Sequence, residues 1–239
     1  MPDTLPVPNG GDLVDRGMAE QLRRLHEEWR AGHQRVGWKI GITTPAARKP
    51  HGLTAPVIGR LDGRRVFMDG DTVPLSPLAR VRAEGELALY LDRVVPTDVT
   101  LEEARRAIAR IGPAIELIDL NLARDDIRII LEHSIFHDAV VFGPQWPPAV
   151  LDTERTLLPL GRRNGKCVRT PEPAMIPADL AALVVLTART LGRYGEQLLP
   201  GDRIISGSYI VPLVVEPGDT VEVDFGFLGK VVANTVPAP

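Results

Sequence analysis

The stretch VRAEGELALYL, residues Val81–Leu91, has the composition of a buried β-strand, because apolar residues fill its second half and turn-rich sequence flanks it. Side chains of a strand alternate between its two faces, so residues two apart point the same way, roughly 6–7 Å from each other. Glu84 and Glu86 therefore share one face with Ala88. The other face carries Gly85, Leu87, Leu89 and Leu91, and we expect it to belong to the core.

Two carboxylates on one side of a mostly apolar strand repel each other and are costly to bury without partners. A divalent cation would reconcile Glu84 with Glu86, because hard cations take several oxygen ligands. A half-exposed strand with a solvated acidic edge fits the pattern as well. The strand alone leaves both interpretations open.

The composition is that of a globular protein of one large domain or two small ones. The chain has 239 residues, a net charge of −3 and 44% hydrophobic residues, which does not favour a protein that binds nucleic acid or a membrane surface. No apolar run approaches the ~18 residues of a membrane span. The single cysteine, Cys167, excludes an intrachain disulfide and suits a reducing cytoplasm.

The sequence predicts a flexible leader over residues 1–11 and then a helix from Asp12 to about Ala31. It also predicts helices over 100–110, ended by Gly112-Pro113, and over about 178–191. Strands are expected at 66–68 and 72–75, joined by a hairpin turn, and in a C-terminal meander over 203–236. His133 and His137 would share a face of a helix, but zinc lacks a third ligand.

Two short motifs have polar residues in unusual places. Lys39 lies among apolar neighbours between Gly37 and Gly41, where either a ligand approaches the backbone or a surface lysine extends to solvent. Ser206-Gly207-Ser208 ends a strand, and its hydroxyls and backbone N–H either hold a carboxylate or form a polar turn.

The sequence lacks phosphate-binding glycine loops, a GxSxG elbow and a CxxC pair. The order of its motifs, from about residue 12 to the end, resembles the fumarylacetoacetate hydrolase superfamily, and within it the 2-keto-4-pentenoate hydratase branch. The matching segments are Gly37-Trp38-Lys39-Ile40-Gly41-Ile42-Thr43, Gly59-Arg60-Leu61, Glu84-Gly85-Glu86-Leu87-Ala88, Pro113-Ala114-Ile115-Glu116-Leu117-Ile118-Asp119, Gly201-Asp202-Arg203-Ile204-Ile205-Ser206-Gly207-Ser208, Gly218-Asp219-Thr220-Val221 and Gly226-Phe227-Leu228-Gly229.

The resemblance implies an α+β fold, a mixed β-roll with a few peripheral helices, usually assembled as a homo-oligomer. It implies one catalytic domain over 12–239, with a helix and a small α/β part to about residue 75 and the β-roll after it. It implies a Mg²⁺ or Mn²⁺ site and a small 2-oxo acid substrate. The residues so implied are Glu84, Glu86 and Glu116 for the metal, Lys39 for catalysis, and Arg60, Leu61, Ser206, Gly207 and Ser208 for the substrate.

The implied activity is that of a lyase, a hydratase of aromatic catabolism that acts on a 2-oxo or 2-hydroxydienoate through a metal-bound enolate. The loop before Gly59 departs from the family, because Ala55-Pro56-Val57-Ile58 is apolar where we expect an acidic proton-transfer residue. His137 or Asp138 is then expected to transfer the proton.

This departure keeps alternatives open. Decarboxylation, tautomerisation and C–C hydrolysis use the same enolate step, and hydrolysis would need a His–Glu pair, for which Glu132-His133 is a candidate. A catalytically silent member and a specialised biosynthetic enzyme with a larger substrate are further possibilities.

Overall fold

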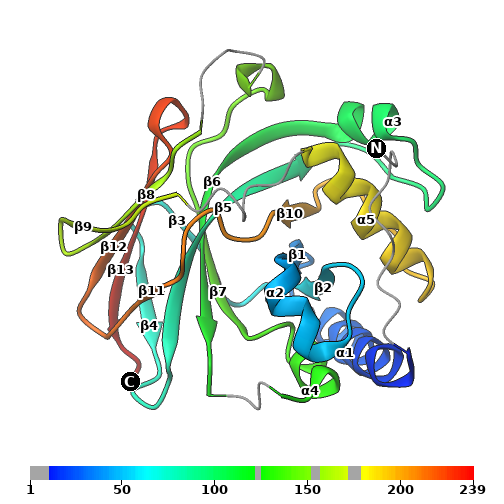
Figure 1. Cartoon of the computed structure of the whole chain (residues 1–239), viewed down its shortest axis with the longest axis horizontal. Helices are drawn as coiled ribbons and strands as arrows, with labels where there is room; N and C mark the ends of the chain where they lie inside the picture. The colour runs from blue at the N-terminus through cyan, green and yellow to red at the C-terminus, as the bar shows by residue number, and fades with distance from the viewer. Residues whose placement is uncertain (1–10, 122–124, 152–156, 172–178) are drawn as a thin grey trace.

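The computed structural model describes residues 11–121, 125–151, 157–171 and 179–239. In this part of the chain the strands form two sheets, with helices beside the larger one (Figure 1). The larger sheet has the order β2-β1-β10-β5-β6-β7-β3, with β11 paired to β5, and the smaller has the order β4-β13-β12-β8-β9. Such mixed sheets with few helices agree with the expected α+β class.

The strands of the larger sheet are β1 (Gly37–Gly41), β2 (Val57–Arg60), β3 (Val66–Met68), β5 (Val81–Leu91), β6 (Ile108–Asp119), β7 (His137–Phe142), β10 (Arg203–Ile205) and β11 (Leu213–Val214). Those of the smaller sheet are β4 (Thr72–Leu75), β8 (Leu160–Arg163), β9 (Lys166–Arg169), β12 (Thr220–Asp224) and β13 (Lys230–Pro237). The helices are α1 (Gly11–Arg30), α2 (Pro45–Arg48), α3 (Leu101–Ala107), α4 (Ile127–Glu132) and α5 (Leu180–Gly192), with short 3₁₀ turns at Lys49–His51, Pro148–Leu151 and Gly226–Leu228.

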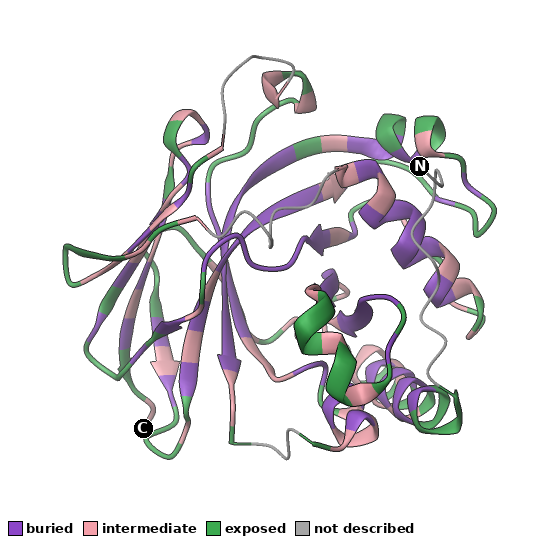
Figure 2. Ribbon diagram, in the orientation of Figure 1, coloured by how far each residue is buried: buried purple, intermediate pink, exposed green. Residues whose placement is uncertain are grey.

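The predicted strand at 81–91 is confirmed as β5, and it pairs with β6 along its whole length. Both strands are buried over most of their residues (Figure 2). The face of β5 that carries Gly85 packs against the smaller sheet, since a Cβ on Gly85 would lie 2.7 Å from the Val223 side chain. The opposite face of β5 therefore carries Glu84 and Glu86 toward the other side of the larger sheet.

Helices α1 and α4 form a separate packing unit beside β1 and β2. The predicted first helix is confirmed, and Met18 on it contributes to a small apolar cluster with Ile130 and Leu131 of α4. Gly17 allows the two helices to approach closely, because a Cβ there would lie 2.8 Å from the carbonyl oxygen of Arg128. This unit has a small core of its own, while Leu22 and Leu25 on α1 belong to the main core.

The prediction that Gly112-Pro113 ends a helix is wrong. Helix α3 ends at Ala107, and Gly112 and Pro113 lie within β6. A side chain at Gly112 would meet the carbonyl oxygen of Pro144 at 2.1 Å, so the glycine permits another segment to cross the strand. The helix begins at a capping box of Thr100 and Glu103, but pairing with β5 overrides the helical pattern beyond Ala107.

Two expected strand connections are also wrong. Strand β3 pairs with β7 in the larger sheet and β4 with β13 in the smaller one, so residues 69–71 link the sheets and close no hairpin. The C-terminal strands form no meander, since β10 and β11 join the larger sheet while β12 and β13 form a hairpin in the smaller. Turn residues give a change of direction, whereas the partner strand depends on distant packing.

The predicted leader falls almost wholly in residues 1–10, outside the described residues, and the first described residue, Gly11, already belongs to α1. In the described segments, no helix is both long enough and apolar enough to span a membrane.

The first prediction concerns Gly37, where β1 meets β10. Its φ is 138°, and a Cβ would lie 2.0 Å from the carbonyl oxygen of Arg203. Gly37→Ala should lower the free energy of unfolding by about 3 kcal/mol or more, measured by urea denaturation. Gly70→Ala is the matched control, because Gly70 has φ 85° but open space around it, and we expect a loss of about 1 kcal/mol. Equal losses would contradict the close-packing argument.

Candidate active site

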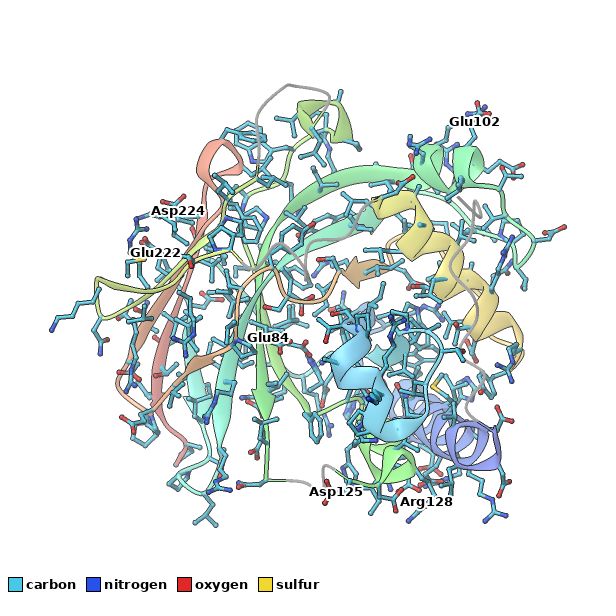
Figure 3. The ribbon with its side chains drawn as sticks, in the orientation of Figure 1. Glu84, Glu102, Asp125, Arg128, Glu222 and Asp224 are labelled. Carbon is cyan, nitrogen blue, oxygen red and sulfur yellow. The ribbon has the colours of Figure 1, made fainter. Side chains whose placement is uncertain are left out.

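Three glutamates meet on one face of the larger sheet. Glu84 and Glu86 come from β5, and Glu116 lies directly opposite Glu84 on β6. One carboxylate oxygen of each lies within 4.8 Å of the others. Glu86 and Glu116 are fully buried, whereas Glu84, which Figure 3 labels on β5, is half-buried. The carboxylate of Glu116 therefore does lie beside those of Glu84 and Glu86.

The pKa values of the three glutamates are shifted by burial and by the charges around them. Burial, and then the charge of Glu116, raise the pKa of Glu84 to about 7. The same causes, with the charge of Glu84, raise the pKa of Glu86 well above its ordinary value. Burial acts in the same direction on Glu116, but the Lys39 ammonium and His137 outweigh it and lower the Glu116 pKa. If all three glutamates were ionised, the cluster would therefore carry more negative charge than its own protein partners neutralise.

Lys39 and His137 both contact the same oxygen of Glu116. The Lys39 Nζ lies 2.5 Å from Glu116 Oε1, and it donates a second hydrogen bond to the carbonyl oxygen of Ile135 at 3.0 Å. The His137 Nδ1 lies 2.7 Å from Glu116 Oε1, which implies that Nδ1 carries the proton. Lys39 is 2% exposed, so the alternative of a surface lysine extending to solvent is wrong.

Several polar atoms of this cluster are buried without a hydrogen-bond partner in the described chain: Glu86 Oε1, Glu116 Oε2 and His137 Nε2. Buried polar atoms are nearly always satisfied, so orphaned ones point to a ligand. The other oxygen of each glutamate is held, Glu116 Oε1 by Lys39 and His137, and Glu86 Oε2 by the backbone N–H of Gly207 at 2.8 Å. Two free carboxylate oxygens beside Glu84 form a donor set that suits Mg²⁺ or Mn²⁺.

The Ser206–Ser208 turn reaches the cluster through its backbone. Gly207 donates to Glu86, and its φ of 87° and its approach to Thr43 leave no room for a side chain. The Ser206 hydroxyl accepts a hydrogen bond from the Leu87 N–H and donates to the Gly207 carbonyl oxygen, while the Ser208 hydroxyl donates to Ile210. Both hydroxyls are thus engaged within the protein.

Other predicted site residues have their described polar partners away from the three glutamates or lie among apolar side chains. Arg60 pairs with Glu28 of α1 at 2.7 Å, and Asp138 pairs with Arg65 at 2.8 Å. Leu61 is buried in an apolar cluster. His133 follows the end of α4, and His137 begins β7, so they share no helical face and the zinc interpretation has no support.

Sequence reasoning missed two groups at the candidate site, one beside Lys39 and one beside Glu86. One is the backbone carbonyl of Ile135, which no side-chain pattern reveals. The other is Tyr209, whose pKa is raised by burial and then by the charge of Glu86. Tyr209 follows the Ser-Gly-Ser motif directly, so an extension of that motif by one residue would have included it.

The second prediction is that stability depends on pH in a way that a divalent cation reverses. The pKa of Glu84 is raised from 4.5 to about 7 by folding, so the cation-free protein should be most stable below the lower value and lose stability as the pH rises through the higher one. The lowered pKa of Glu116 acts only below this window. Between about pH 5 and about pH 8, the melting temperature without cation should fall by on the order of 5 °C.

Millimolar Mg²⁺ should remove that fall, because the ion takes the place of the protons. Glu86→Gln is the comparison variant, and its cation-free profile should be flatter than that of the parent. A melting temperature that follows the same pH profile with and without Mg²⁺ would contradict the cation site.

Comparisons with known proteins agree with this geometry, although no family model matches the chain. The chain is 30% identical over 233 residues to a 2-keto-4-pentenoate hydratase from Paraburkholderia xenovorans, covering 96% of this chain and 85% of that protein. It is 29% identical to an Escherichia coli 2-oxo-hept-4-ene-1,7-dioate hydratase, with 91% and 86% covered, and 27% identical to a Pseudomonas putida 4-oxalocrotonate decarboxylase, with 90% and 82% covered.

Solved structures show the same fold. A 4-oxalocrotonate decarboxylase from Pseudomonas putida, complexed with magnesium and adipate, superposes with a TM-score of 0.82 at 24% identity, covering 91% of this chain and 85% of that one. A fumarylpyruvate hydrolase from Pseudomonas aeruginosa, in complex with Mn²⁺ and pyruvate, gives 0.62 at 17% identity, with 85% and 90% covered. With its hydratase relatives, this places the chain in the fumarylacetoacetate hydrolase superfamily, in the 2-keto-4-pentenoate hydratase-like branch.

Proposed function

We propose that this protein is a divalent-metal-dependent hydro-lyase that adds water to a small 2-oxo or 2-hydroxydienoate. The observation that carries the proposal is the group of three glutamates with two orphaned, buried oxygens beside a buried lysine. Relatives named hydratases cover nearly the whole chain, which supports the reaction class.

Glu84, Glu86 and Glu116 would hold the metal ion. A bound Mg²⁺ or Mn²⁺ would polarise the C2 oxygen of a 2-oxo acid and stabilise the negative charge that develops there. The protein holds one oxygen of Glu86 and one of Glu116 by hydrogen bonds, so their remaining oxygens keep their direction before any ligand arrives. Such preorganisation reduces the reorganisation that binding would otherwise require.

Lys39 is the residue we assign to the developing charge on the substrate. An ammonium has three N–H donors, and two of those of Lys39 are directed to Glu116 and to the Ile135 carbonyl. The third remains for a substrate oxygen. Because the group is 2% exposed, that hydrogen bond would act with little competition from water.

His137 is the residue we favour for proton transfer. Its Nδ1 is oriented by Glu116, and its buried Nε2 has no partner in the described chain. The segment before Gly59 offers no acidic side chain for proton transfer, because Ala55, Val57 and Ile58 are all buried apolar residues. Asp138 is the weaker candidate, because its carboxylate is already paired with Arg65.

The reaction would proceed in two stages. The dienol first becomes its keto form, as its hydroxyl proton leaves and a proton is delivered to the far carbon. Water then adds to the conjugated C=C bond, its hydroxyl to the carbon β to the carbonyl and a proton to the α carbon. Both stages need a group that gives and takes a proton, which is the role assigned to His137.

Decarboxylation of a vinylogous β-keto acid is the second candidate. The apolar segment Ala55–Ile58 favours it, because loss of CO₂ requires no activated water. A relative named 4-oxalocrotonate decarboxylase supports the same alternative. C–C hydrolysis is less favoured, since Glu132 is paired with Arg128 in α4 and does not activate water with His133.

The proposal includes a homo-oligomer, which rests on the resemblance. A cytoplasmic location rests on the single cysteine and is part of the same proposal.

The third prediction concerns turnover. With Mg²⁺, the protein should remove the ultraviolet absorbance of a 2-hydroxydienoate, and NMR of the product should show the 4-hydroxy-2-oxo acid. Glu86→Ala should lower turnover by about 100-fold or more, because an acidic oxygen of the ion site is lost. Glu102→Ala is the matched control, an exposed acid on α3 labelled in Figure 3, and should retain activity. Release of CO₂ from a 2-hydroxydienoate that carries a second carboxylate at its far end, assayed in parallel, would instead indicate the decarboxylase.

The fourth prediction separates two neighbouring side chains. His137→Gln should lower kcat by about 100-fold or more, because it removes the titratable ring that transfers protons. Asp138→Asn should change kcat by less than about threefold, since that side chain is directed to Arg65. The reverse ranking of the two variants would assign proton transfer to Asp138.

A further inference from the structure

The segment before β7 has an unusual backbone. Ser134, Ile135 and Phe136 follow one another with φ values of 54°, 54° and 65°. Residues other than glycine rarely adopt positive φ, and a β-branched residue such as Ile135 does so least readily. Such a conformation persists only where surrounding contacts force it, and it is found most often at functional sites.

This left-handed turn serves two groups of the candidate site. Its central carbonyl, that of Ile135, accepts the hydrogen bond from Lys39 Nζ at 3.0 Å. The residue that follows the turn is His137, whose Nδ1 is hydrogen-bonded to Glu116. The turn therefore sets where the ammonium and the imidazole meet the carboxylate.

A buried glutamine holds the turn in place. Gln21 of α1 is fully buried, and its Oε1 accepts hydrogen bonds from the backbone N–H of Arg60 at 2.7 Å and from the Ser134 hydroxyl at 3.2 Å. Its Nε2 lies 3.3 Å from the carbonyl oxygen of Ile58. The Arg60 N–H also donates to the Ser134 hydroxyl at 3.0 Å. Helix α1, strand β2 and the turn thus meet at one side chain.

The turn and Lys39 are pressed against the same glycine of β2. A Cβ on Gly59 would lie 2.9 Å from the Ser134 carbonyl oxygen and 2.8 Å from Lys39 Cγ. The turn and the Lys39 side chain are thus closely packed on Gly59, and a shift of the turn would move the Ile135 carbonyl that accepts from the ammonium. The hydrogen bonds of Gln21 fix the turn at the end nearest this contact.

Attachment of α1 does not require a polar residue at this place. Val14 and Met18 already pack α1 against α4 in an apolar cluster, which also contains Ile135. Burying an amide carries a desolvation cost, which an apolar side chain of the same length would not carry. What the glutamine adds to this packing is the set of hydrogen bonds that join β2 to Ser134 at the start of the turn.

We propose that Gln21 is a positioning residue of the active site, which holds the left-handed turn Ser134–Phe136 and through it fixes the Lys39 ammonium against Glu116. The proposal rests on the proposed function, because that assigns Lys39 to catalysis. It concerns neither metal ligands nor the reaction outcome.

The test uses Gln21→Met, which keeps the length of the side chain but removes its hydrogen bonds, and the milder Ser134→Ala. The first readout is the ¹H–¹⁵N signal of the Lys39 ammonium in ¹⁵N-lysine-labelled protein, assigned by its disappearance in Lys39→Arg. A buried, hydrogen-bonded ammonium exchanges slowly enough to be seen. The second readout is kcat and KM of the Mg²⁺-loaded protein on the dienoate. Thr187→Val is the control, because it removes a buried hydroxyl of α5 that bonds Leu183.

In Gln21→Met the ammonium signal should shift or broaden beyond detection, and kcat should fall by about tenfold to 100-fold. KM should stay within about twofold, because the hydrogen bond of Lys39 to the substrate oxygen gains its strength as negative charge develops in the transition state. Ser134→Ala should show the same pattern to a smaller degree, and Thr187→Val should lower the melting temperature alone.

An unchanged ammonium signal in a folded Gln21→Met or Ser134→Ala protein would overturn the proposal, whatever the activity. A changed signal in a protein that turns over no dienoate would support the positioning role and reject the proposed function. The two conclusions therefore fail separately.

Discussion

Repulsion among Glu84, Glu86 and Glu116 is the interaction on which the rest of the site depends. Three acids in a buried place favour protonation, as the raised pKa values of Glu84 and Glu86 show. The protein compensates only in part. Lys39 and His137 hold one oxygen of Glu116, and Gly207 holds one oxygen of Glu86, while the second oxygen of each remains unpaired. A bound dication supplies what is lacking.

The fold supplies the register that makes this convergence possible. Glu84 lies directly opposite Glu116 in the long β5–β6 pair, and period two brings Glu86 to the same face. The other face of β5 packs against the smaller sheet, so a slip by one residue would bury the acids in the main core. One face of β5 thus packs in the main core, and the opposite face carries the glutamates of the candidate metal site.

The strand, its two faces and the acidic pair could be predicted from the sequence, because strand periodicity is a local property. The motif order led to Glu116 and Lys39, whose side chains do meet. The change from helix to strand at Ile108 could not be predicted, since pairing across the sheet decides it. Nor could the Ile135 carbonyl or the contact of His137 with Glu116, because both depend on a backbone conformation that residue types do not reveal.

The central claim is that the three glutamates form a divalent cation site, and a crystal structure of the protein with Mn²⁺ and oxalate tests it most directly. The account predicts an anomalous scattering peak bound by Glu86 Oε1, Glu116 Oε2 and Glu84, with oxalate completing the coordination and Lys39 still on Glu116. A manganese peak elsewhere, with these carboxylates bound to nothing but protein and water, would contradict it.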